Sequence, residues 1–172
     1  MHSSVKQFVS TGALAAALLL GGAQGVAAQA AGGGQQAQQP APPPIVALRK
    51  AVMQSNTQHI AALRALLGGE LNLPLHILKH TQALADNGAM MGTIFPADGV
   101  TTHALSRAKP EIWSNGADFA AKVKAFADAT RNLNAVAQRG FNDQTLEALN
   151  AVQPTCGGCH TPYRGPAPAA TN

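Results

Sequence analysis

The sequence CGGCH, at residues 156–160, brings two thiols and an imidazole together within five residues. Cys156 and Cys159 are the only two cysteines of the chain, and His160 directly follows the second. This spacing is the attachment signature of a c-type haem. Each thiol adds across one vinyl group of the same porphyrin, while the adjacent imidazole binds the iron. The motif therefore predicts one haem c, covalently bound through two thioethers, with His160 as the proximal iron ligand.

Other uses of these residues explain less of the motif. A disulfide between the two cysteines suits an exported protein but leaves the adjacent histidine without a role. A thioredoxin-like redox pair belongs to a fold of alternating strands and helices, and the sequence has no strand pattern. A zinc site needs four ligands, and only one histidine is adjacent. Covalent haem attachment uses all three residues.

The elements that must position this motif are helices. Positions i, i+3 and i+4 of a helix share one face, so a helix through residues 156–160 directs both thiols and the imidazole to one side. Apolar residues at spacings of three and four predict four amphipathic helices. They run from Pro44 to Gly68, from Pro74 to Met91, from Ser114 or Asn115 to Gly140, and from Asn142 onward, where Leu146, Leu149 and Val152 should point inward.

These helices indicate an all-α fold, an up-and-down antiparallel four-helix bundle with covalently bound haem, in residues 45–165. Residues 92–109 lack a sustained period and are predicted to form a long connection. Aromatic residues make up only 4% of the chain. A large apolar porphyrin would fill the space that aromatic side chains usually occupy.

The chain ends have a different composition from the bundle. Residues 1–30 have the layout of a secretory signal peptide, with Lys6, an apolar run from Gly12 to Leu20, and small residues near Ala28. That run is shorter than the roughly 20 residues that span a membrane. Residues 31–44 are an uncharged mixture of Gly, Gln and Pro that predicts a disordered linker, and residues 166–172 predict a disordered tail. We expect export to the periplasm, with no membrane span after signal removal.

Several parts of the sequence resemble one family of haem proteins, the class II c-type cytochromes. This family comprises the high-spin cytochromes c' and their low-spin c556 and c554 relatives. The resemblance covers residues 45–165. It is carried by CGGCH near the C-terminus, by Tyr163-Arg164, and by the segments PEIW at 110–113 and LRKAVM at 48–53.

The resemblance also implies roles for individual residues. The position of Met53 lies over the distal face of the haem, where its thioether can be the sixth iron ligand. Core filling is the other interpretation of this methionine; Met90 and Met91 are weaker ligand candidates. Arg49 would meet a haem propionate, or else lie solvated on the surface. Arg164 would lie near the haem edge, unless Pro162 ends the helix before it.

Two functions follow from these expectations. The first is a soluble electron carrier ligated by His160 and Met53, with other periplasmic redox proteins as partners. The alternative is a five-coordinate, high-spin protein that binds nitric oxide or carbon monoxide. The resemblance makes a homodimer possible.

Other classes of function find little support in the sequence. No basic run is longer than Arg49-Lys50, so we expect no nucleic-acid partner. We expect no enzyme activity, because the distal helix face offers only Arg49 as an acid–base group. His76 and His80 are four residues apart, a spacing that can hold a metal ion. No third ligand is evident, so we interpret both as exposed polar positions.

Overall fold

The computed structural model describes residues 41–69, 71, 73–97, 103 and 105–167. The predicted signal peptide, residues 31–40 of the predicted linker and residues 168–172 of the predicted tail lie outside the described residues. Among the described residues, no helix combines the length and apolar character that crossing a membrane requires.

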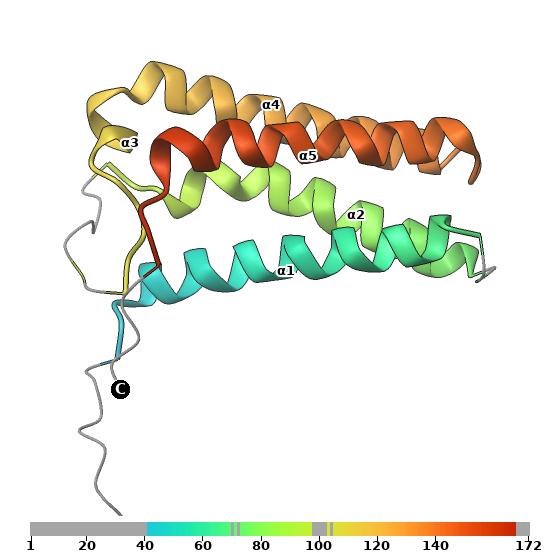
Figure 1. Ribbon diagram of the computed structural model, residues 1–172, viewed down its shortest axis with the longest axis horizontal. Helices are drawn as coiled ribbons and strands as arrows, with labels where there is room; N and C mark the ends of the chain where they lie inside the picture. Colours follow the sequence, from blue (N-terminus) through green and yellow to red (C-terminus); the bar gives the residue numbers. More distant parts are fainter. Residues whose placement is uncertain (1–40, 70, 72, 98–102, 104, 168–172) are drawn as a thin grey trace, which may run out of the picture. The chain divides into compact units, whose positions relative to one another are not determined.

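The described chain is helical, as predicted, and its long helices form an antiparallel four-helix bundle (Figure 1). The helices are α1 (Pro44–Leu67), α2 (Pro74–Met90), the 3-10 helix η1 (Met91–Ile94), α3 (Glu111–Ser114), α4 (Gly116–Ala137) and α5 (Asp143–Tyr163). Contacts are extensive between α2 and α4, between α4 and α5, and between α1 and α2, but sparse between α1 and α5. The side chains between α1 and α5 are therefore free to line a cavity.

Local sequence signals account for most helix boundaries. Pro44 occupies the first turn of α1, where its missing N–H costs no hydrogen bond. The side chain of Asn142 caps α5 by accepting hydrogen bonds from the backbone N–H groups of Gln144 and Thr145. Gly69 and Gly140 follow α1 and α4 with φ of 101° and 149°, which L side chains rarely adopt.

The third predicted helix is observed as α4, and its N-cap is Asn115, one of the two starts expected for it. The short helix α3 precedes it and was not predicted. Likewise, the 3-10 helix η1 extends the end of α2 into the connection predicted for residues 92–109. Both pieces are single turns, too short for a helical period to reveal them.

The core is built from one face of each long helix. Its largest fully buried side chains are Leu63, Thr81, Leu84, Thr130, Leu133, Thr145, Leu149 and Val152. On α5, Leu149 and Val152 are buried as predicted, but Leu146 is 38% exposed. The prediction for Leu146 was wrong because each residue turns the helix by about 100°, which places this side chain about 100° from the face centred on Thr145 and Val152.

The last helix continues through both of its prolines. Pro154 and Pro162 lie inside α5, so Pro162 does not end the helix before Tyr163. The N–H of Arg164 still donates to the carbonyl of His160 at 3.0 Å. Beyond the helix, Arg164 forms an antiparallel bridge with Ala108, which fastens the long connection to the end of α5.

Candidate functional site

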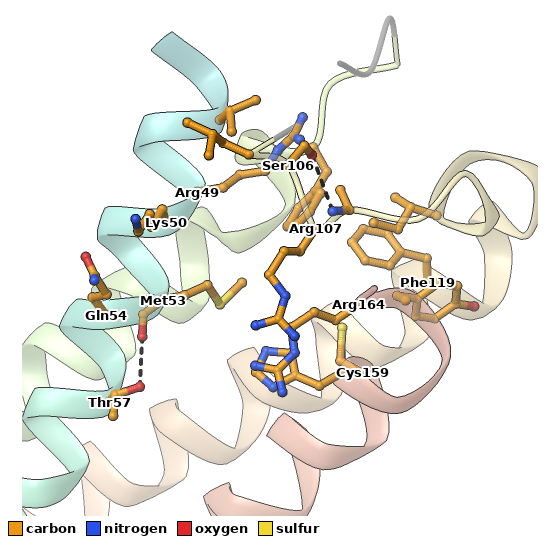
Figure 2. A pocket seen from close by; sticks show the side chains of 17 residues that line it. Arg49, Lys50, Met53, Gln54, Thr57, Ser106, Arg107, Phe119, Cys159 and Arg164 are labelled. Atoms are coloured by element: carbon orange, nitrogen blue, oxygen red, sulfur yellow. Dashed lines mark hydrogen bonds between the residues drawn. The ribbon is translucent and has the colours of Figure 1, made fainter. Parts of the chain in front are cut away.

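Two adjoining cavities lie between α1 and α5, with volumes of about 460 and 290 Å³. Figure 2 shows the larger one, with side chains entering from α1, from the connection before α3, and from α4 and α5. Both cavities are bordered by Met53, Phe95, Phe119, Cys159, His160 and Arg164. The two spaces therefore form one site around the CGGCH segment.

The motif residues lie on this site as the helical spacing predicted. Cys159 and His160 border both cavities, and Cys156 borders the smaller one. Both cysteines are free thiols and partly buried. Burial raises the pKa of Cys156, and it raises the pKa of Cys159 with a further contribution from Cys156. Before a haem is attached, both are therefore protonated thiols at neutral pH.

The electrostatic surroundings of His160 favour its neutral form. Partial burial lowers the pKa of the imidazole, and the positive charges of Arg164 and Arg107 lower it further. A neutral imidazole presents a nitrogen lone pair, which is the form that binds metal ions. His160 is thus chemically suited to ligate iron.

Arg49 is buried, with 6% of its surface exposed. Its Nε donates a hydrogen bond to the carbonyl oxygen of Ile94 at 2.6 Å. Its guanidinium carbon lies 5.1 Å from the ring centroid of Phe95 and 5.8 Å from that of Trp113, within the range of cation–π attraction. The interpretation of Arg49 as a solvated surface residue is therefore wrong. Arg49 also borders the larger cavity.

Arg107 is a site residue that the sequence did not reveal. Its Nε donates to the carbonyl oxygen of Gly165 at 2.9 Å, and its side chain borders the larger cavity together with Arg164 (Figure 2). Arg107 lies in a connection without periodicity, so no pattern in the sequence marks it. With Arg49 and Lys50, these residues give the larger cavity a cationic border.

Aromatic side chains form a wall near the end of α5. The ring of Phe119 makes edge contacts with Phe95 and Tyr163, at centroid distances of 5.0 and 5.2 Å. The hydroxyl of Tyr163 donates to a carboxylate oxygen of Asp118 at 2.5 Å. This hydrogen bond is the main reason why the pKa of Tyr163 rises to about 12. These contacts join α4, α5 and the residues after η1 beside the cavity.

Met53 is the α1 residue whose thioether enters the site. It is partly buried and borders both cavities, and Figure 2 shows its side chain directed from α1 toward the space beside Cys159. Of the weaker candidates, Met91 is buried and borders the smaller cavity, whereas Met90 is 53% exposed.

The residues around this space fit a haem c. The thiols of Cys156 and Cys159 suit two thioether bonds, and neutral His160 suits an iron ligand. Apolar walls suit a porphyrin face, and the cationic border suits its two carboxylates. A helical bundle with such a site is characteristic of the class II c-type cytochromes.

The chain belongs to the cytochrome c' family. The sequence model of the family described as Cytochrome C' matches residues 44–164. A cytochrome c' of Pararhodospirillum photometricum is 34% identical over 119 residues, which cover 69% of this chain and 94% of that relative. Covalently bound haem c is the cofactor of this family, and hence of this chain.

Solved structures agree with this assignment. The nitric oxide complex of a cytochrome c' variant from Alcaligenes xylosoxidans has a TM-score of 0.63 and 25% identity, over 71% of this chain and 94% of that one. A cytochrome c' described as having a ligand-controlled dimer dissociation has a TM-score of 0.64 and 24% identity, over 71% and 95% of the two chains. The similarity to this second structure supports the assignment of the fold.

Proposed function

We propose that this chain is a periplasmic haem protein that binds nitric oxide or carbon monoxide at the sixth coordination position of iron. Cys156 and Cys159 would form the thioethers, and His160 would ligate the iron. The haem iron supplies the electron-pair acceptor to which a diatomic ligand binds. The observation that carries the proposal is the mainly apolar lining of the smaller cavity, with Met53 and Ile60 from α1 and Phe119, Val123 and Phe126 from α4, in a chain of the cytochrome c' family.

The residues of the chain would hold the haem, balance its charge and restrict access to the iron. Cys156 and Cys159, on one helix, would hold the porphyrin beside α5, and the apolar side chains that line the cavities would exclude water from it. The guanidinium groups of Arg49, Arg107 and Arg164 balance the negative charge of the propionates. Met53, which borders both cavities from α1, would limit the size of molecules that reach the iron.

The sequence favoured Met53 as the sixth ligand, and electron transfer with periplasmic redox proteins remains the second candidate. It is supported by the position of Met53, which borders the same cavities as His160 but from α1. We rank gas binding first because a relative with the same fold and 25% identity is described as a nitric oxide complex.

Three further proposals concern the setting of the site. The signal-like pattern of residues 1–30 supports export to the periplasm, with residues 31–44 as a linker and residues 166–172 as a tail. The dimer dissociation described for one structural neighbour supports a homodimer. We propose ligand binding without enzymatic turnover, because Arg49, the acid–base group expected on the distal helix, is already engaged with Ile94.

A pair of variants separates the two candidate functions. In the ferric holoprotein, Met53→Leu removes the thioether but keeps an apolar side chain of similar volume. If the sixth position is open, both wild type and Met53→Leu give high-spin electron paramagnetic resonance spectra. If Met53 ligates iron, the wild type is low-spin and Met53→Leu becomes high-spin, and the proposal is then abandoned. Met90→Leu, at an exposed position, is the matched control.

A further inference from the structure

Three histidines gather on α1 and α2, and none of them borders the two cavities of the haem site. The Nδ1 atoms of His59 and His80 are 2.8 Å apart, and the two ring centroids are 5.1 Å apart. His76 lies one turn before His80 on α2, with ring centroids 6.4 Å apart. The interpretation of both α2 histidines as exposed holds for His76 but was wrong for His80, which is half-buried.

The ring spacing is that of imidazoles around one metal ion. A zinc–nitrogen bond is about 2.0–2.1 Å long, and a ring centroid lies roughly 1 Å beyond the nitrogen, so two tetrahedral imidazole ligands have centroids roughly 5 Å apart. His59 and His80 already have this separation. The distance between the two Nδ1 atoms needs to increase only to roughly 3.3 Å for both to bind one ion.

His76 is within reach as a third ligand. Residues four apart on a helix share a face, so His76 and His80 can bind one ion through a change of side-chain rotamer. In the part of the chain that the structure describes, no three such side chains are already grouped around one point as metal ligands. The described residues therefore hold a two-histidine pair, which His76 would complete by rotation.

The protonation state of the pair suits a cation. Two Nδ1 atoms at this distance share one proton, because a hydrogen bond needs one donor and one acceptor. One ring therefore offers a lone pair at this nitrogen. Burial lowers the pKa of His59, and nearby His80 lowers it further, so His59 is neutral at neutral pH. A divalent ion can then replace the shared proton without displacing a salt bridge.

We propose that His59 and His80, completed by His76, bind a first-row transition-metal ion, Zn²⁺ or Cu²⁺, between α1 and α2. Imidazole nitrogens are suitable ligands for both ions. Water molecules complete the coordination. The site is separate from the haem site. The proposal does not depend on whether the iron binds a gas or transfers electrons.

Calorimetric titration of the mature holoprotein with ZnCl2, in a buffer that does not bind metal, tests this proposal. The expected result is one ion per chain. His59→Asn or His80→Asn should each lower the affinity by at least about tenfold, because one of the paired ligands is lost. His76→Asn should weaken binding by a smaller factor. His103→Asn is the matched control and should leave binding unchanged, because His103 is outside the cluster.

A thermal melt distinguishes the loss of a metal ligand from the misfolding of a variant. Zinc should raise the melting temperature of the wild type and of His103→Asn, but not that of His80→Asn, because a bound ion stabilises only the state that holds it. His76 is exposed, so its replacement tests the site without disturbing the core. Absence of zinc binding by the wild type, binding that survives His59→Asn and His80→Asn, or one ion per two chains would each overturn the proposal.

Discussion

The Nε atom of Arg49 on α1 donates a hydrogen bond to the carbonyl oxygen of Ile94 at 2.6 Å, across 45 residues of chain. Ile94 is the last residue of η1 and is buried. The same guanidinium lies over Phe95, the next residue. One buried cation therefore holds the residues after α2 against the first helix, where they border the cavity.

Replacement of Arg49 should destabilise the bundle. Arg49→Gln removes the donor to Ile94 and the cation over Phe95, and it leaves a buried carbonyl without its partner. We expect the free energy of unfolding of the holoprotein to fall by about 1–3 kcal/mol, measured by denaturant titration. The control is Lys50→Gln, because Lys50 is the exposed neighbour and also borders the cavity. Equal stability of the two variants would contradict the structural role of Arg49.

At Gly88 the backbone of α2 lies close against α4. A Cβ atom added at this position would overlap with Oγ1 of Thr130 and would lie 3.1 Å from Cα of Ala127. Thr130 has little freedom to move, because it is fully buried and its hydroxyl donates to the carbonyls of Phe126 and Ala127. A glycine at this position therefore permits the contact between the two helices.

Gly88→Ala should lower the thermal stability of the holoprotein. Overpacking costs about 1–3 kcal/mol, and a contact this short places the cost near the upper end. The gain in helix propensity, roughly 1 kcal/mol, is smaller. Gly116→Ala is the matched control, since an added Cβ there has no neighbour within 4 Å. A melting temperature of Gly88→Ala equal to that of the control would show that α2 and α4 lie farther apart.

The single tyrosine of the chain allows a test of the wall beside the cavity. The hydrogen bond to Asp118 is the largest cause that raises the pKa of Tyr163 from 10.0 to about 12. Because the folded state keeps this proton longer than the unfolded state, the stabilisation is complete below pH 10.0 and is lost as the pH rises toward about 12. Ultraviolet titration of the holoprotein should show tyrosinate forming near the upper value.

Asp118→Asn provides the comparison for this titration. The carboxamide keeps an oxygen acceptor but removes the negative charge that opposes tyrosinate formation. The midpoint should therefore move down toward 10.0, the ordinary value for tyrosine. A wild-type midpoint already at that value would mean that Tyr163 does not bond to Asp118.

The sequence predicted the helices, whose apolar residues recur with a helical period, and the haem-attachment motif, whose spacing is set by its chemistry. Helix boundaries at Pro44 and Asn142 depend on local capping, which a short segment encodes. The placement of Cys156, Cys159 and His160 on one face of a helix follows from their spacing alone. The position of Met53 beside the site came from the family resemblance.

Contacts between distant residues were less predictable. Arg107 lies in a connection with no period, and its position depends on the bridge between Ala108 and Arg164. The meeting of His59 and His80 has a partial signal, because both are nearly equidistant from the turn between α1 and α2 in an antiparallel pair. This signal can be used only when it is known that α1 and α2 pack side by side with His59 level with His80.

The most direct test of the proposed function is the absorption spectrum of the reduced holoprotein before and after addition of carbon monoxide. If the sixth position is open, the reduced protein has a broad high-spin spectrum, and carbon monoxide shifts it at low concentration. If the thioether of Met53 is bound, the reduced protein has a sharp alpha band that carbon monoxide leaves unchanged. We predict the first result. The second would contradict gas binding and would support electron transfer as the function.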